Sequence, residues 1–160
     1  MTDLLDDLRV GLWNFCVADL EQSTRFYRDG LGFVEGQTMS ATIEVGSEMA
    51  RGWNLAEGGK VSSRFLSRPD IKLSLMQFEE PKPVGDRHRK PINQLGLRSL
   101  TFICSNPKAI AARLEELGGK IVHDDQRGRF DALLVTDPDG VLLQLEAIPD
   151  GVLEAAFKKQ

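Results

Sequence analysis

The sequence offers few side chains that can transfer a proton. Glu146 lies near the end of an alternating stretch, where we expect it to face inward among apolar residues. His123 is followed by Asp124 and Asp125, so that a base stands beside carboxylates able to orient it. Glu146 and His123 are therefore the candidate catalytic residues. A histidine in a loop after a strand end is the alternative interpretation of His123.

Glu146 must be positioned by the segment TDPDGVLLQLEA, residues 136–147. The DPDG sequence is typical of a tight turn. The strand that follows alternates, with one face apolar and the other formed by Leu142, Gln144 and Glu146. Gln144 thus shares a face with the candidate acid, and its role there is the central question of this sequence.

The order of strand, helix, glycine stop and strand occurs twice. In the first half we expect strands at 9–17, beginning at Phe33 and Val34, and at 39–45, 61–66 and 71–78, a helix after Asp19, and a short helix at 46–53 capped by Ser47. In the second half, Asn106 and Pro107 predict a helix start, with strands at 97–104, 120–123, 130–136 and 141–146 and a terminal helix at 150–159.

This repetition predicts an internal duplication. The expected fold is α+β, with two tandem βαβββ modules forming a curled mixed sheet around a cavity. The first module is expected at 1–80, a proline-containing charged linker at 81–93, the second module at 94–148 and a C-terminal helix or tail at 149–160.

The composition narrows the class of partner. The chain has 160 residues, a net charge of −4 and 41% apolar residues, so the surface is not the basic one that nucleic acid requires. The sequence has no apolar stretch long enough to span a bilayer and no signal-peptide pattern at its start, so we expect no membrane partner and a cytoplasmic location. Cys16 and Cys104 are expected to be free, buried thiols.

The chain resembles the vicinal oxygen chelate superfamily, also called glyoxalase/bleomycin resistance protein/dioxygenase proteins. The resemblance is carried by VADLEQSTRFYRDGLGF at 17–33, SNPKAIAARLEELGGKI at 105–121 and TDPDGVLLQLE at 136–146. It implies a cupped sheet with an open face. In metal-containing members, it also implies four ligands on four strands that hold an ion acting as a Lewis acid. A homodimer is expected by the same resemblance.

Transferring the four ligand positions to this sequence gives Leu12, Ser74, Ser99 and Gln144. Leucine has no donor atom, and serine and glutamine are neutral, weak ligands compared with imidazole, carboxylate or thiolate. We therefore predict no metal at these positions and no cofactor.

The expected function is the metal-independent binding of a small, largely apolar or aromatic molecule. A mixed apolar and polar lining is typical of such a pocket, although a collapsed core is the alternative. The ligand-binding candidates are Leu12, Asn14, Trp53, Phe65, Ser74, Met76, Ser99, Thr101 and Gln144. For Trp53, an aromatic wall and ordinary packing remain open. The alternative function is a metal-independent isomerase, epimerase or lyase using Glu146 or His123. A metal-dependent lyase or extradiol dioxygenase is disfavoured by the donor set.

Overall fold

The computed structural model describes residues 5–6, 8–125 and 132–157. These residues form two compact units. One unit contains the described residues up to Leu20 together with Gly32–Pro83. The other contains Glu21–Leu31 and the described residues from Val84 onward. The helical residues 21–31 thus belong to the unit that also holds the second half of the chain.

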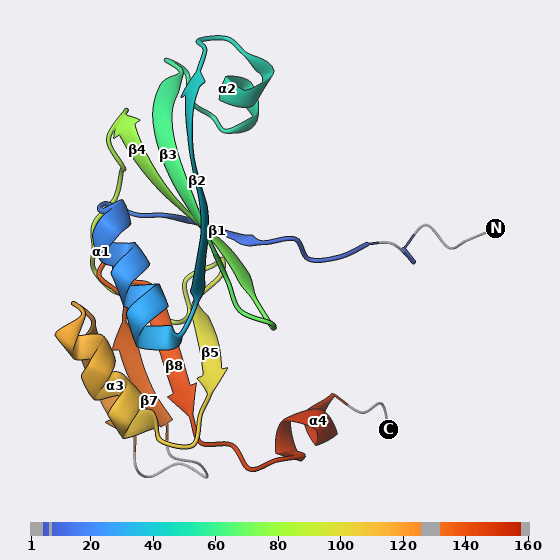
Figure 1. Ribbon diagram of the computed structural model, residues 1–160, viewed down its shortest axis with the longest axis vertical. Coiled ribbons are helices and arrows are strands. Elements are labelled where there is room, and N and C mark those ends of the chain that lie inside the picture. The colour runs from blue at the N-terminus through green and yellow to red at the C-terminus, as the bar shows by residue number, and fades with distance from the viewer. Residues whose placement is uncertain (1–4, 7, 126–131, 158–160) are drawn as a thin grey trace. The chain divides into compact units, whose positions relative to one another are not determined.

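The first unit is built on a four-stranded mixed sheet, which we call sheet 1, with the order β1-β4-β3-β2. The strands are β1 (Trp13–Cys16), β2 (Val34–Ile43), β3 (Gly59–Ser67) and β4 (Lys72–Glu80). β1 runs parallel to β4, and the other two pairs are antiparallel. Figure 1 shows β2, β3 and β4 side by side.

One face of sheet 1 is apolar and buried. In the register, Phe15 lies opposite Leu75, and Leu73 lies opposite Leu66. Directly opposed residues point to the same face of a sheet. These four side chains are between 0 and 8% exposed, so this face forms the core side of the unit. The other face, which we call the open face, carries Asn14, Ser74 and Phe65 in its register.

A short helix lies at one end of that second face. α2 (Glu48–Gly52) begins after Ser47, whose Oγ accepts a hydrogen bond from the Ala50 backbone N–H at 3.1 Å. This confirms the predicted N-cap. Ala50 packs with Ile43 and Val61 in a buried cluster that also contacts Leu55, Met76 and Phe78.

The second unit holds a second four-stranded mixed sheet, sheet 2, with the order β5-β8-β7-β6. Its strands are β5 (Ser99–Ile103), β6 (Lys120–Asp125), β7 (Ala132–Thr136) and β8 (Leu142–Glu146). β5 runs parallel to β8, while β6 and β8 each pair with β7 in the antiparallel sense. Sheet 2 therefore repeats the strand order of sheet 1, as the internal duplication predicted.

Helices cover one face of sheet 2. α3 (Pro107–Glu116) contacts β6, β7 and β8 as well as the π-helical turn η1 (Phe26–Gly30), which continues from α1 (Leu20–Arg25). Asn106 caps α3 by accepting a hydrogen bond from the Ala109 N–H at 3.0 Å, and Pro107 occupies the first turn as predicted. The buried apolar residues of these helices and of sheet 2 are Phe26, Tyr27, Ala111, Leu114, Leu133, Val135, Leu143 and Leu145.

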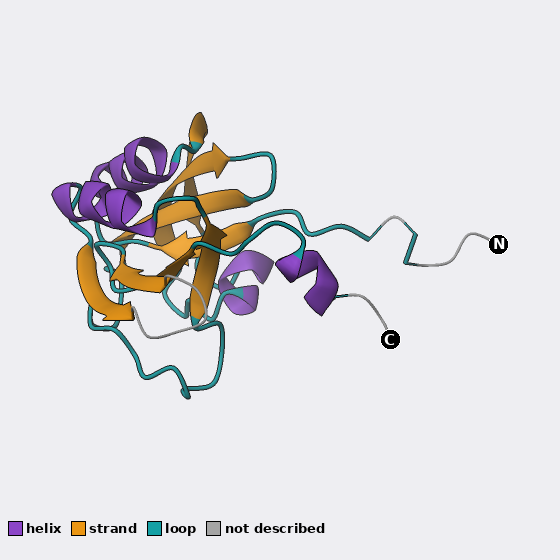
Figure 2. Cartoon of the chain, turned by 90° about the horizontal axis from the view of Figure 1, so that it is seen from below, coloured by secondary structure: helices purple, strands orange, loops and turns teal. Residues whose placement is uncertain are grey.

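Residues 81–98, all of which the structure describes, contain neither helix nor strand and belong to the loops of Figure 2. The terminal helix α4 is Val152–Ala156, shorter than the 150–159 expected. Among the described residues, no helix is long and apolar enough to cross a membrane. The α+β class with two βαβββ modules is confirmed, and neither sheet is closed into a barrel.

Three local expectations were wrong. His123 lies within β6, not in a loop after a strand. Cys16 is exposed rather than buried, because it points to the open face of sheet 1. The strand expected to begin at Phe33 and Val34 and the strand expected at 39–45 are one strand, β2 (Val34–Ile43), in which a register shift between Glu35 and Thr38 interrupts the regular alternation.

Candidate functional site

The open face of sheet 1 brings together three of the predicted ligand-binding residues in one row. Asn14 of β1 lies opposite Ser74 of β4, and Ser74 lies opposite Phe65 of β3. All three side chains therefore leave the sheet on the same side. Ser74 is only 3% exposed, so a buried hydroxyl stands beside an aromatic ring and an amide.

The next row on the same face is richer in sulfur. Cys16 lies opposite Met76, Met76 opposite Ser63, and Ser63 opposite Met39 of β2. Met76 is half-buried, whereas Cys16 and Met39 are exposed. Flexible, polarizable methionine side chains suit a surface that adapts to apolar ligands.

Trp53 lies at the end of this face, immediately after α2. Its ring contacts Phe78 of β4 edge to face, with centroids 6.3 Å apart and planes at 73°. Trp53 is nevertheless 46% exposed, so one side of the indole is packed and the other is open. Leu12 precedes β1, outside the paired residues, and is 40% exposed.

Sheet 2 presents a more polar row. Thr101 of β5 lies opposite Gln144 of β8, Gln144 opposite Leu134, and Leu134 opposite His123. His123 and Gln144 thus share a face, but β7 separates their strands. Two strand spacings amount to about 10 Å, so their backbones lie too far apart for the pair to be neighbours. Ser99, two residues before Thr101, is half-buried on the same face.

Gln144 has a defined partner. Its Nε2 donates a hydrogen bond to Glu146 Oε1, two residues further along β8. Both side chains are half-buried, while Leu143 and Leu145 on the opposite face are fully buried. The candidate acid and the residue at the last ligand position therefore form one amide–carboxylate pair.

The turn before β8 holds the most strongly perturbed carboxyl group of the described residues. Asp137 is 2% exposed. Its Oδ1 accepts hydrogen bonds from the N–H groups of Asp139 and Val141 at 3.0 and 2.8 Å, and its Oδ2 accepts one from the Tyr27 hydroxyl at 2.9 Å. Burial raises the pKa of Asp137 to about 6, although the hydrogen bonds from Val141 and Tyr27 oppose the shift.

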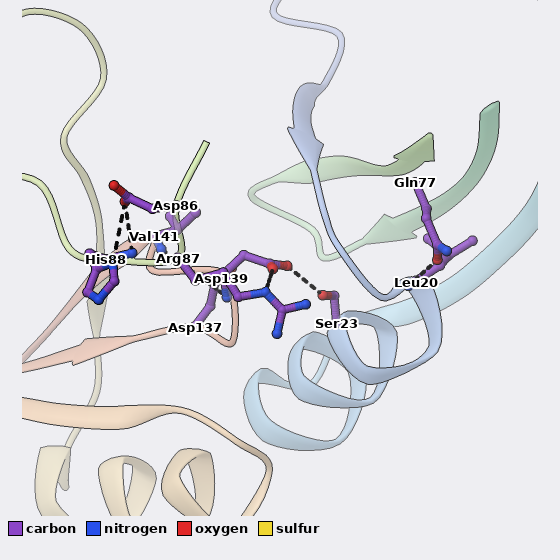
Figure 3. Close-up of polar contacts among 9 residues, drawn as sticks. All are labelled: Leu20, Ser23, Gln77, Asp86, Arg87, His88, Asp137, Asp139 and Val141. Carbon is purple, nitrogen blue, oxygen red and sulfur yellow. Dashed lines mark hydrogen bonds and ion pairs between the residues drawn. The ribbon is translucent and has the colours of Figure 1, made fainter. Parts of the chain in front are cut away.

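Asp139 extends this network to Ser23 and Arg87, as Figure 3 shows. Its Oδ2 accepts a hydrogen bond from Ser23 Oγ at 3.3 Å, and its Oδ1 lies 3.3 Å from Arg87 Nε in an ion pair. Sequence reasoning treated the aspartates of the turn only as turn formers. Tyr27 is the single tyrosine of the chain. A tyrosine hydroxyl that is buried needs a hydrogen-bond acceptor, and this requirement was the signal in the sequence that could have pointed to a buried aspartate.

A pocket of about 250 Å³ lies beside α2 in the first unit. It is lined by Gly46, Ala50, Arg51, Asn54, Leu55 and Ala56. None of the predicted site residues lines it. Arg51 is the cationic residue of the pocket lining. Its guanidinium donates a hydrogen bond to the Gly46 carbonyl, which links Arg51 to the residue that precedes the helix cap.

The structure thus has two four-stranded mixed sheets, each built from one βαβββ module. This fold characterises a class of proteins in which one face of each sheet is left open. The family model described as Glyoxalase/Bleomycin resistance protein/Dioxygenase superfamily matches residues 9–145. The chain therefore belongs to this superfamily, as its motifs indicated. None of the curated proteins compared with the chain matches it.

Solved structures support the same fold. A glyoxalase family protein from Bacillus cereus has 19% identity and a TM-score of 0.71 and covers 88% of this chain and 93% of its own. The fosfomycin resistance protein FosX from Mesorhizobium loti has 16% identity and a TM-score of 0.57 and covers 94% and 98%. FosX from Listeria monocytogenes, solved with Mn(II) and sulfate, has the same identity, TM-score and coverage.

The residues of this chain do not fit the metal that some superfamily members hold. The four ligand positions implied by the resemblance carry Leu12, Ser74, Ser99 and Gln144, a set without charge or imidazole. Within the described part of the chain, no three histidine, cysteine, aspartate or glutamate residues are grouped to hold an ion. A divalent transition metal would need such donors.

Proposed function

We propose that this chain binds a small, largely apolar or aromatic molecule on the open face of sheet 1, without a metal. The proposal depends on one observation. Phe65 and Met76 flank the buried Ser74 on that face, and Trp53 borders it with one side of its ring exposed. Apolar surface with a few fixed polar groups favours ligand burial. On sheet 2, taken by itself, Ser99, Thr101 and Gln144 stay proposed ligand-binding residues, because Thr101 and Gln144 lie opposite each other on one face.

The two tryptophans provide a test with an internal control. Trp13 lies opposite Leu73 in the register and so points to the other face of sheet 1, whereas Trp53 borders the proposed site. We expect the fluorescence of the Trp13→Phe variant to change on titration with indole-free aromatic compounds such as 2-naphthol. The Trp53→Phe variant should show no saturable change. A response carried by Trp13 alone would contradict the proposed location.

The identity of the ligand is best sought by a thermal-shift screen of metabolites and aromatic antibiotics. A ligand present at 100 times its Kd stabilises the folded state by about 2.7 kcal/mol. For a chain of this size, that corresponds to a shift in Tm of about 5 to 10 °C. We expect hits to lose their effect in the Met76→Ala variant and to keep it in Met49→Ala, which removes an exposed side chain of α2.

An enzymatic function is the second candidate, because His123 and the Gln144–Glu146 pair lie on one face of sheet 2. An isomerase, epimerase or lyase would use Glu146 or His123 for proton transfer. Each screening hit should therefore be assayed for turnover. Consumption by the wild type, lost in Glu146→Gln or His123→Gln, would favour the enzyme. Saturable binding without turnover would favour the binding protein.

A homodimer and a cytoplasmic location complete the proposal. Superfamily membership supports the homodimer. Light scattering coupled to size-exclusion chromatography should give twice the chain mass of 17.8 kDa. A mass near 17.8 kDa at micromolar concentration would contradict the dimer.

A further inference from the structure

The pocket beside α2 is built from one short segment of the first unit. The six described residues that line it fall between Gly46 and Ala56, and Figure 1 shows this segment at the end of β2. The pocket volume of about 250 Å³ lies just below the range of about 300–1,000 Å³ that is typical of sites for drug-sized ligands. The pocket therefore suits a molecule of a few heavy atoms.

Backbone hydrogen bonds hold the pocket lining in shape. The Asn54 N–H donates to the Arg51 carbonyl at 3.2 Å, and the Leu55 N–H donates to the Ala50 carbonyl at 2.8 Å. This pair of bonds is that of a Schellman motif, which here closes the C-terminus of α2. Leu55 also packs against the buried cluster that contains Ala50. Because these residues are held before anything binds, little ordering is needed on binding.

The Schellman motif places an asparagine where glycine is usual. Asn54 has a φ of +55°, and among the described residues it is the one non-glycine residue with a positive φ. Glycine adopts this conformation without the steric cost of a Cβ. Asn54 lines the pocket, and its side-chain amide carries two N–H donors. The position thus carries a polar group that the turn itself does not require.

Arg51 supplies the charge of the pocket. It is the one charged residue among the described lining residues; Glu48 and Glu57 are near in sequence but do not belong to that lining. The bond from its guanidinium to the Gly46 carbonyl joins two lining residues. That bond uses one of the five N–H groups of a guanidinium. A planar guanidinium held in this way matches the two oxygens of a carboxylate.

We infer that this pocket binds the carboxylate of a small aliphatic acid. The guanidinium of Arg51 donates to the carboxylate oxygens, and the side-chain amide of Asn54 donates a further hydrogen bond. Ala50, Leu55 and Ala56 give the short apolar chain of the acid a surface to contact. None of the residues proposed for the open face lines the pocket, so this inference goes beyond the proposed function and does not depend on it.

Three small probes test the preference: 3-methylbutanoate, 3-methylbutanamide and inorganic phosphate. The first two share an apolar chain and differ in charge, whereas phosphate is an anion without an apolar part. Titrations of ¹H–¹⁵N spectra of the full chain follow the side-chain amide of Asn54 and the Nε–H of Arg51. We expect saturable shifts at both groups. The acid should bind about 10 times more tightly than its amide, because charge-assisted hydrogen bonds are stronger, and more tightly than phosphate.

Variants locate the site. Asn54→Gly removes the amide and suits the positive φ, so the variant should fold and bind the acid about 3-fold more weakly. Arg51→Gln should weaken binding of the acid about 10-fold and leave that of the amide within about 2-fold. Lys60→Gln is the matched control, because Lys60 is an exposed cation of β3 outside the lining. Its affinities should equal those of the wild type.

The results separate this inference from the proposed function. Equal binding of the acid and its amide, or a preference for the acid that Arg51→Gln leaves unchanged, would overturn the carboxylate site. An equal loss in Lys60→Gln and Arg51→Gln would also overturn it, since the effect would then be one of overall charge.

The remaining outcomes are as decisive. Phosphate binding as tight as that of the acid would overturn the assignment to an organic acid. Shifts confined to the open face, at Ser74 and Met76, would overturn the pocket site and support the proposed function. Absence of saturable binding by all three probes would overturn this inference and leave the proposed function to the tryptophan titration.

Discussion

The hydroxyl of Tyr27 donates a hydrogen bond to Asp137 Oδ2 at 2.9 Å, across 110 residues of chain. Tyr27 lies in η1 and Asp137 in the turn before β8, and both side chains are almost completely buried. The pair ties the helical segment from the first half of the chain to the closing strand of the second half. It thereby supports the strand that carries Gln144 and Glu146.

Removing the hydroxyl should destabilise the protein. In Tyr27→Phe, the buried Asp137 carboxyl loses a donor, and an unsatisfied buried acceptor costs about 1–3 kcal/mol. We expect the free energy of unfolding, measured by urea titration, to fall by that amount. Ser40→Ala is the control, since it removes an exposed hydroxyl that lies 2.9 Å from Ser62 Oγ, and should cost less than about 0.5 kcal/mol. Equal effects of the two substitutions would contradict the role of Tyr27.

The raised pKa of Asp137 predicts a pH dependence of stability with a definite sign. Its pKa rises from the ordinary value of about 3.8 to about 6 on folding, chiefly because the group is buried. Between about pH 4 and pH 6, the folded chain keeps a proton that the unfolded chain has lost. Stability from this group is therefore complete at low pH and declines as pH rises through about 6, by about 3 kcal/mol in total.

Urea titrations from pH 4.5 to pH 8 on the wild type and on Asp137→Asn isolate this contribution. The wild type should lose stability relative to the variant between pH 4.5 and about pH 6.5, and the difference should be constant above that. Tyr27→Phe should extend the decline to higher pH, because the Tyr27 hydrogen bond lowers the pKa of Asp137. Parallel curves for wild type and Asp137→Asn would show that Asp137 does not titrate in this range.

Adding metal should leave the stability unchanged. Leu12, Ser74, Ser99 and Gln144 offer neither charge nor imidazole to an ion. A site with a Kd of 1 μM would raise the free energy of unfolding by about 2.7 kcal/mol at 100 μM metal. We instead expect Mn(II) or Zn(II) at that concentration to shift Tm by less than about 1 °C. Elemental analysis that found one tightly held transition metal per chain, released in Gln144→Ala, would contradict this expectation.

Local signals were sufficient for much of the fold. The caps at Ser47 and Asn106 were predictable because an N-cap depends on the next three residues alone. The repeated pattern predicted two βαβββ modules, and the two sheets have equivalent strand orders. Counting from a shared motif placed Leu12 and Ser74 at corresponding positions of their strands, whereas the parallel pairing of β1 with β4 sets Asn14, two residues after Leu12, opposite Ser74.

The remaining features depend on tertiary context. The position of His123 at the end of the strand expected at 120–123 suggested a loop, but pairing of β6 with β7 holds His123, Asp124 and Asp125 in a strand. Cys16 follows the buried Phe15, yet it is exposed because alternate residues of β1 point to opposite faces. The contact of Tyr27 with Asp137 joins segments too far apart in sequence for any local pattern to reveal it.

Two glycines in the segment around α2 should differ sharply when replaced by alanine. Gly46 and Gly58 have nearly the same positive φ, +71° and +70°, so the conformational cost of a side chain is similar at both positions, about 1 kcal/mol. A Cβ at Gly46 would meet open space, whereas a Cβ at Gly58 would lie 2.2 Å from the Ile43 carbonyl oxygen.

Because that oxygen belongs to backbone at the end of β2, it cannot turn aside as a flexible side chain would. We therefore expect Gly58→Ala to cost about 1–3 kcal/mol more than Gly46→Ala in urea unfolding. Gly58→Ala should also disturb the packing of Trp53 against Phe78, seen as a red shift of tryptophan emission in a Trp13→Phe background. Equal costs for the two substitutions would mean that the segment from Gly46 to Gly58 is free to move away from β2.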